Sequence, residues 1–148
     1  MAHCVVEVGT SSYYSALRDS IDEPVLREIC RNIAADEFRH YKLFYRYAKH
    51  FQKIEGVSRC ARSKIVLGRF FETGDDELSY AYYCGSSDTA PYVRIQANIA
   101  CMARTLPLYR FDHVQLGVGM TLKSAGIKPQ GILGKCITRV SWIAFRLY

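Results

Sequence analysis

The sequence predicts an all-α protein, and three observations carry that prediction. Apolar residues recur every three or four positions over long stretches, which is the period of one helical face. No run of alternating apolar and polar residues bounded by turn dipeptides indicates a strand. Apolar residues make up 49% of the 148-residue chain, which is enough for one domain with a core and too much for a disordered segment.

The clearest predicted element is a long helix over residues 24–52. Asp22 or Glu23 can cap its first turn, Pro24 fits the first helical position, and Gly56 ends it. From Val25 to Tyr47 the successive residues of its main stripe are separated by three or four positions, as one face of a helix requires, and Ala48 lies beside Tyr47 on that face. The stripe comprises Val25, Ile29, Ile33, Glu37, His40, Phe44, Tyr47, Ala48 and Phe51.

Shorter helices complete the predicted fold. Helical character over residues 2–19 precedes the long helix, and the two should form a hairpin within residues 1–56. Residues 57–148 are expected to form a helical extension that packs on the hairpin within the same domain. Its helices are predicted at 58–71, 76–83, 91–105, 111–124 and 131–148, separated by a turn at 73–76, a loop at 85–89, Pro107, Gly126 and Pro129.

The last predicted helix has two distinct faces. One face is apolar along its whole length, from Ile132 to Leu147. The other carries Lys135, Arg139, Trp142 and Arg146 at spacings of four, three and four. Such a basic face can contact an acidic protein or a membrane surface, and it can equally be an ordinary solvated face.

The composition indicates which classes of partner and which cellular compartment to expect. The net charge is +6, but the basic residues are scattered and form no recognised nucleic-acid-binding module, so no nucleic-acid partner is expected. No stretch approaches the ~20 apolar residues of a transmembrane helix. The six cysteines form no Cys-x-x-Cys pair, which favours reduced, buried thiols in a cytoplasmic protein.

The chemistry-bearing motif lies on the apolar stripe of the long helix. Glu37 and His40 occupy positions where an apolar residue is expected, and burying either without a partner is costly. Glu-x-x-His on a helix is half of the ligand set of carboxylate-bridged di-metal bundles, which also take a lone Glu from a neighbouring helix. Glu7, on the preceding helix, can supply that lone carboxylate.

These residues carry a resemblance to a known family. The run from Val6-Glu7 to Leu17, followed by Leu26 to His40, resembles the second half of ferritin-like di-iron carboxylate proteins. Among these are soluble acyl-carrier-protein desaturases and smaller bacterial ferritin-like proteins without an assigned substrate. The resemblance covers about the first 50 residues. It implies a ferritin-like helical bundle, here a half-bundle hairpin with additional C-terminal helices.

The resemblance also implies a site and an activity. Glu7 corresponds to the lone carboxylate ligand, Glu37 to the bridging ligand and His40 to the imidazole ligand, while Asp36 corresponds to the acid that orients the histidine. A complete site holds two iron ions, and manganese accepts the same ligands. The expected function is therefore an oxygen-activating oxidoreductase of unspecified substrate, and no further catalytic residue is indicated.

Only half of that ligand set is present in the sequence. A complete site requires four carboxylates and two histidines, and no second Glu-x-x-His occurs. Two copies of the chain can rebuild the set as a symmetric homodimer. Alternatively, a missing N-terminal half supplies the remaining ligands. A third interpretation is a non-catalytic, metal-free helical interaction protein, or truncated half-domain, that retains ligand residues without a site.

Overall fold

The computed structural model describes residues 1–72, 76–86 and 90–147, with the side chains of 70–72 and 76–78 left out. Within these ranges the chain is helical and contains no strand, so the predicted all-α class is confirmed. None of the described helices combines the length and apolar character needed to cross a bilayer. The elements are α1 (Ala2–Arg18), α2 (Pro24–Glu55), α3 (Arg59–Glu72), α4 (Asp76–Gly85), α5 (Arg94–Thr105), the 3₁₀ turn η1 (Leu106–Leu108), α6 (Phe111–Ala125) and α7 (Ile132–Leu147).

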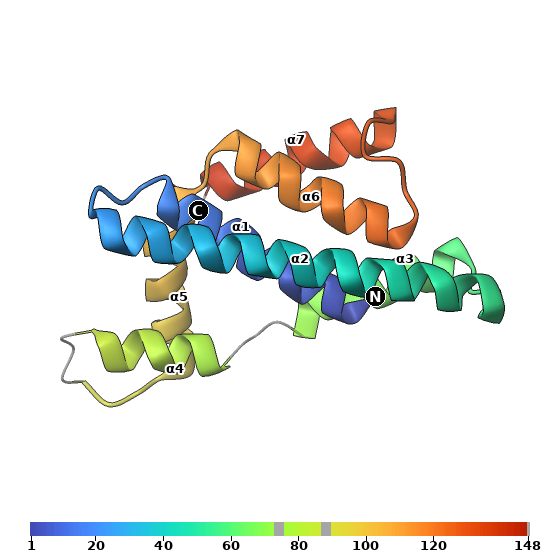
Figure 1. Cartoon of the computed structure of the whole chain (residues 1–148). Coiled ribbons are helices and arrows are strands. Elements are labelled where there is room, and N and C mark those ends of the chain that lie inside the picture. The colour runs from blue at the N-terminus through green and yellow to red at the C-terminus, as the bar shows by residue number, and fades with distance from the viewer. Residues whose placement is uncertain (73–75, 87–89, 148) are drawn as a thin grey trace.

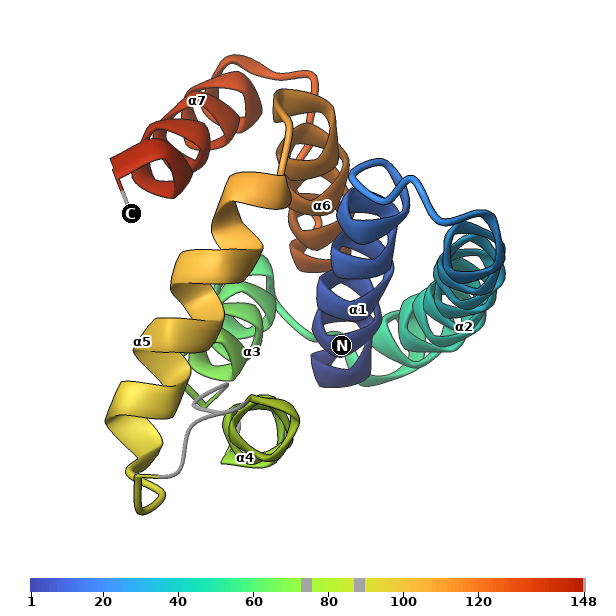
Figure 2. The ribbon, with the colours of Figure 1, turned by 90° about the vertical axis from the view of Figure 1, so that its left-hand side faces the viewer.

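Helix α1 lies at the centre of the helical assembly. It forms an antiparallel hairpin with α2 and also packs against α6 and α3 (Figures 1 and 2). Figure 2 shows α1 between α2 and α6, with α7 on the outer side of α6. Two small apolar clusters hold the helices together, one formed by Cys4, Val8, Tyr41 and Met120 and the other by Val5, Val66 and Ala125.

The ends of α2 follow the signals in the sequence. The Glu23 carboxylate accepts hydrogen bonds from the backbone N–H groups of Val25 and Leu26, and Pro24 occupies the first turn. Gly56 adopts φ 63°, a left-handed conformation that terminates a helix at low steric cost. The helix continues to Glu55 because Gly56 is the first residue in this conformation.

Helix α5 begins later than predicted. Residues 91–93 are not helical, and Arg94 is the first residue of the helix. The ring of Tyr92 packs against those of Tyr80 and Tyr83, with centroids 5.2 Å away in each case, and the Tyr83 hydroxyl donates to the carbonyl of Ala90. These contacts hold the segment against α4. The predicted turn at 73–76 and loop at 85–89 lie partly outside the described residues.

The buried face of α2 is not the long apolar stripe. Small residues and one tyrosine, Cys30, Ala34 and Tyr41, face α1, whereas much of the stripe is exposed. Small side chains allow α1 and α2 to approach closely, which explains why this face is buried. The most exposed apolar residues of the stripe are Val25 at 64%, Tyr47 at 57%, Phe51 at 52% and Ile29 at 48%.

The expectation of buried thiols holds for only three of the six cysteines. Cys4, Cys30 and Cys101 are buried, and burial raises the pKa of each thiol. Cys60, Cys84 and Cys136 are exposed, so the prediction is wrong for them. They lie on the solvent-facing sides of α3, α4 and α7.

Candidate metal centre

The hairpin brings together the three ligands predicted from the sequence. His40 Nδ1 lies 3.2 Å from Glu37 Oε2 and 3.9 Å from Glu7 Oε2. One ligand atom from each residue can be chosen so that all three lie within 4.8 Å of one another. Glu37 and His40 face the same way because they are three residues apart on one helix.

The register of the hairpin places Glu7 opposite the Glu-x-x-His motif. The buried hydroxyl of Ser11 donates to the carbonyl of Ala34 across the α1–α2 contact. Because the two helices run in opposite directions, Glu7, one turn before Ser11, lies beside the turn of α2 that follows Ala34. Glu37 is in that turn, and His40 follows it directly.

The two carboxylates are electrostatically unfavourable without a cation. Burial, a hydrogen bond to Glu37 and the charge of Glu37 together raise the pKa of Glu7 to about 7, against the opposing effect of His40. The Glu7 side chain is only 13% exposed. Among the described residues, the only basic side chain paired with either carboxylate is that of His40, and neither carboxylate pairs with a lysine or arginine.

The arrangement fits a divalent metal ion. Oxygen and nitrogen ligands bound to one ion at about 2.1 Å lie at most about 4.2 Å apart. Both distances to His40 are within this limit, and because all three ligand atoms lie within 4.8 Å of one another, a small side-chain rotation would bring them onto one ion. Carboxylate and imidazole suit iron, manganese and zinc alike. Three protein ligands leave coordination positions of the ion open. The His40 side chain is 56% exposed, so the cluster is accessible from solvent. One chain can therefore hold one ion without filling its coordination sphere.

Asp36 does not contact the histidine that it was expected to orient. Its carboxylate pairs with Arg39, and both side chains are more than half exposed. Nδ1 of His40 faces Glu37 instead. Asp36 is therefore not the residue that orients the ring in this structure.

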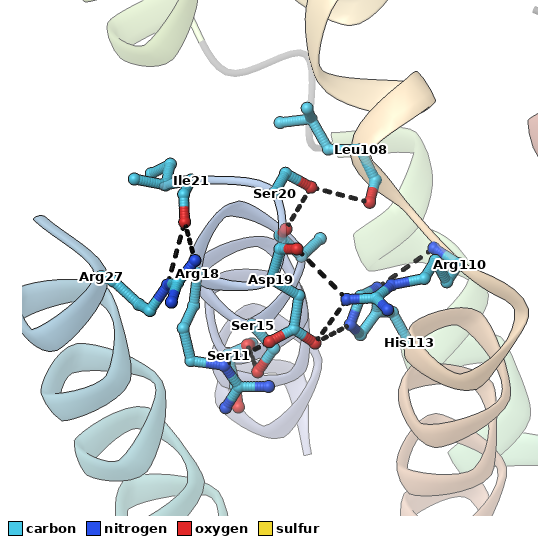
Figure 3. Close-up of polar contacts among 11 residues, drawn as sticks. Ser11, Ser15, Arg18, Asp19, Ser20, Ile21, Arg27, Leu108, Arg110 and His113 are labelled. Atoms are coloured by element: carbon cyan, nitrogen blue, oxygen red, sulfur yellow. Dashed lines mark hydrogen bonds and ion pairs between the residues drawn. The ribbon is translucent and has the colours of Figure 1, made fainter. Parts of the chain in front are cut away.

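A second polar cluster joins the C-terminal end of α1 to the start of α6. Figure 3 shows the Asp19 carboxylate among the side chains of Arg18, Arg110 and His113. Nδ1 of His113 accepts the backbone N–H of Arg110, so the proton of the neutral ring is on Nε2, which donates to Asp19 at 2.9 Å. Both ring nitrogens are occupied, so His113 caps the start of α6 and has no free nitrogen for a ligand.

The Asp19 cluster predicts a specific loss of stability in acid. The hydrogen bond from Arg18 is the main cause that lowers the pKa of Asp19 to about 2, and His113 adds to it. A lowered pKa stabilises the folded state above the ordinary value of 3.8, and this contribution is lost as the pH falls towards 2. Because Asp19 is partly exposed, we expect Asp19→Asn to cost only about 1 kcal/mol at pH 7.

Urea denaturation at several pH values measures this effect. The difference in unfolding free energy between the native chain and Asp19→Asn should shrink from pH 5 to pH 2. Asp22→Asn is the matched control, because the Asp22 side chain is fully exposed and should show almost no difference at any pH. A difference for Asp19→Asn that stays constant down to pH 2 would contradict the assignment.

Comparison with known proteins brings no match: no family model, no curated protein and no solved structure matches the chain. The candidate centre is therefore supported by its own geometry and charges. Two carboxylates and an imidazole from two helices converge, and no other cation among the described residues compensates them.

Proposed function

We propose that this chain provides half of a carboxylate-bridged di-iron or di-manganese centre, and that two copies complete it as an oxygen-activating oxidoreductase. The convergence of Glu7, Glu37 and His40, with the pKa of Glu7 raised to about 7, is the observation that supports the proposal. A metal cation would compensate both carboxylates at once. The assembled protein would be a ferritin-like bundle of four helices, two from each copy.

The exposed stripe of α2 supports the pairing of two copies. His40 lies in the middle of this stripe, between Ile29 on one side and Tyr47 and Phe51 on the other. Placing the same face of a second copy against it buries these apolar side chains and brings together two sets of ligands. The sum is four carboxylates and two histidines, which is the ligand set of a di-metal carboxylate bundle.

Each ligand has a distinct chemical role in the proposal. When bound, a pair of reduced metal ions supplies electrons to dioxygen and so generates an oxidant for an organic substrate. Glu37 and Glu7 would hold the metal through carboxylate oxygens, and His40 would hold it through an imidazole nitrogen. Glu7 must release its proton when metal binds, so affinity should increase with pH through about 7. The apolar stripe excludes water from the assembled site.

Metal content and molecular mass test the centre together. Protein purified without chelator should contain about one iron or manganese ion per chain and have the mass of a dimer. Glu37→Ala and His40→Ala should each lower the metal content at least ten-fold and abolish oxygen consumption. Glu28→Ala and His50→Ala are matched controls, because both residues are exposed on α2 away from the cluster.

Two results would overturn this proposal. Unchanged metal content in Glu37→Ala and His40→Ala would show that these residues are not ligands. A folded, metal-free monomer that is indifferent to Glu37→Ala would support the alternative, a non-catalytic helical interaction protein.

A charge placed in the α2 stripe tests the pairing separately. We expect Tyr47→Glu to convert the dimer to a monomer, because the interface would bury the new carboxylate in both copies. Tyr80→Glu is the matched control, since Tyr80 is 53% exposed and Tyr47 57% exposed. Light scattering measures the mass, and a Tyr47→Glu dimer would contradict the proposed interface.

A further inference from the structure

Helix α7 presents its apolar face to solvent. It packs on α6 and η1, and Figure 2 shows it at the outer edge of the molecule. The face that it turns inward contains the buried residues Gly134 and Thr138. The outward face is strongly exposed along its full length, at Ile132 (85%), Leu147 (82%), Val140 (66%), Leu133 (59%) and Ile143 (57%).

Close packing and one aromatic contact explain this orientation. A Cβ atom on Gly134 would lie 2.2 Å from the carbonyl oxygen of Pro129, so only glycine allows this approach between α7 and the preceding loop. Trp142 packs edge-on against Phe111 of α6, with ring centroids 5.9 Å apart. The tryptophan on the basic face therefore anchors α7 to the fold, and the apolar stripe is left without a partner among the described residues.

From Lys123 onward, the charged side chains of the α6–α7 hairpin are all cationic. The last acidic residue is Asp112, and the five charged residues that follow are Lys123, Lys128, Lys135, Arg139 and Arg146. Three of these, Lys123, Lys135 and Arg139, border an open groove of about 1070 Å³ between α2, α6 and α7. Arg139 is also one turn from Ile143, so the cationic edge adjoins the apolar stripe.

The groove extends this cationic edge towards α2. Its lining holds one carboxylate, that of Asp112, and six cationic side chains. None of the six forms an ion pair with a carboxylate in the part of the chain that the structure describes. The cationic side chains are Lys42, Arg46, Lys49, Lys123, Lys135 and Arg139.

Charge and polarity indicate what covers this surface. A symmetric contact between two copies of α7 would bring together two helices whose charged residues are all cationic, which like-charge repulsion disfavours. A protein partner normally forms about one hydrogen bond per 100–200 Å² of interface, but the exposed stripe offers only apolar side chains and the Cys136 thiol. A bilayer needs no hydrogen bond from the apolar face, and anionic headgroups complement the cations beside it.

We propose that the α6–α7 hairpin docks on an anionic lipid bilayer, with the apolar stripe of α7 in the interface and the adjoining cations on lipid phosphates. The helix would lie in the plane of the membrane surface without spanning it. This surface is distinct from the α2 stripe at the metal centre. The two proposals can therefore fail independently.

Vesicle flotation with the full chain tests this docking. The chain should bind mixed phosphatidylglycerol–phosphatidylcholine vesicles and not vesicles of phosphatidylcholine alone. The double variant Lys135→Gln/Arg139→Gln should lower the partition coefficient about 25-fold, at about five-fold for each charge removed. Ile143→Ser should lower it about ten-fold, because one large apolar side chain no longer enters the interface.

Matched variants elsewhere on the surface separate this face from general charge and apolarity. Ile99→Ser is paired with Ile143→Ser, since the two side chains are 59% and 57% exposed. Lys64→Gln/Arg104→Gln removes the same charge from α3 and α5. Both controls should bind vesicles as the native chain does, and circular dichroism confirms that every variant is folded.

Several results would overturn the lipid proposal. The proposal would be wrong if the native chain did not bind anionic vesicles. It would also be wrong if the control variants lowered the partition coefficient as much as the α7 variants do. If Ile143→Ser changed the molecular mass of the protein in solution but left its binding to vesicles unchanged, α7 would contact a second copy instead of a bilayer. Binding to polyglutamate without binding to vesicles would identify an acidic protein as the partner.

Discussion

Raising the pH of the metal-free chain from 5 to 8 is expected to lower its free energy of unfolding by about 2–3 kcal/mol through Glu7 alone. Burial and Glu37 raise the pKa of Glu7 from 4.5 to about 7. A raised pKa means that the folded state holds the proton more tightly than the unfolded state does. The resulting stabilisation is complete below about 4.5 and is lost as the pH rises through about 7.

Glu7→Gln isolates this contribution. Glutamine keeps the size of the side chain and cannot ionise, so the variant should lack this part of the pH dependence and be more stable than the native chain at pH 8. Glu28→Gln, in an exposed ion pair with Arg31, should leave the pH dependence unchanged. The measurement is urea denaturation in the presence of chelator. Identical pH dependence in the native chain and Glu7→Gln would contradict the raised pKa.

The same charges predict how metal affects the native chain. Without chelator, iron(II) or manganese(II) added at pH 8 should restore the lost stability, because the ion binds the deprotonated form of the folded state. The same addition of metal should raise the free energy of unfolding of Glu7→Gln much less, because this variant lacks the carboxylate ligand. An equal gain in both proteins would show that the ion binds elsewhere.

Gly134→Ala is expected to lower the free energy of unfolding by about 3 kcal/mol. The new Cβ would lie 2.2 Å from the Pro129 carbonyl oxygen, so the backbone at the start of α7 must move. Overpacking that forces such a shift typically costs 1–3 kcal/mol, and here the neighbour is rigid backbone. The midpoint and slope of urea denaturation measure the loss.

Gly9→Ala should change stability in the opposite direction. Gly9 is within α1, its backbone has no positive φ, and nothing lies within 4 Å of an added Cβ. Alanine in a helix interior is favoured over glycine by about 1 kcal/mol. If both variants lost stability equally, the close approach at Gly134 would not be the cause.

Local signals in the sequence predicted most of the helices and the convergence at the candidate centre. Glu23, Pro24 and Gly56 mark the ends of α2 because caps and left-handed residues act within a few positions. Glu7 meets Glu37 and His40 because a short turn connects two antiparallel helices, which leaves few alternatives for their pairing. The binding of metal at this cluster remains a prediction.

The choice of buried face could not be predicted in the same way. An apolar stripe shows which face prefers to be covered, but not whether the covering surface belongs to the same chain. In α2 and α7 the small residues Ala34 and Gly134 allow closer packing than the bulky stripe, so the stripe stays outside. The bond between Asp19 and His113 was not predicted either, because 94 residues separate them and nothing local indicates the pairing.

The central position of α1 has a consequence for synthesis on the ribosome. One side of α1 is covered by α2, which follows it directly, but another is covered by α6. His113, the partner of Asp19, is translated 94 residues after it. Helix α6 begins at Phe111, 56 residues after α2 ends at Glu55, so at about 5–20 residues per second the nascent hairpin waits roughly 3–11 s with Val5 and Val8 uncovered on the α6 side. Newly made chains should therefore be clients of ribosome-associated chaperones during that interval.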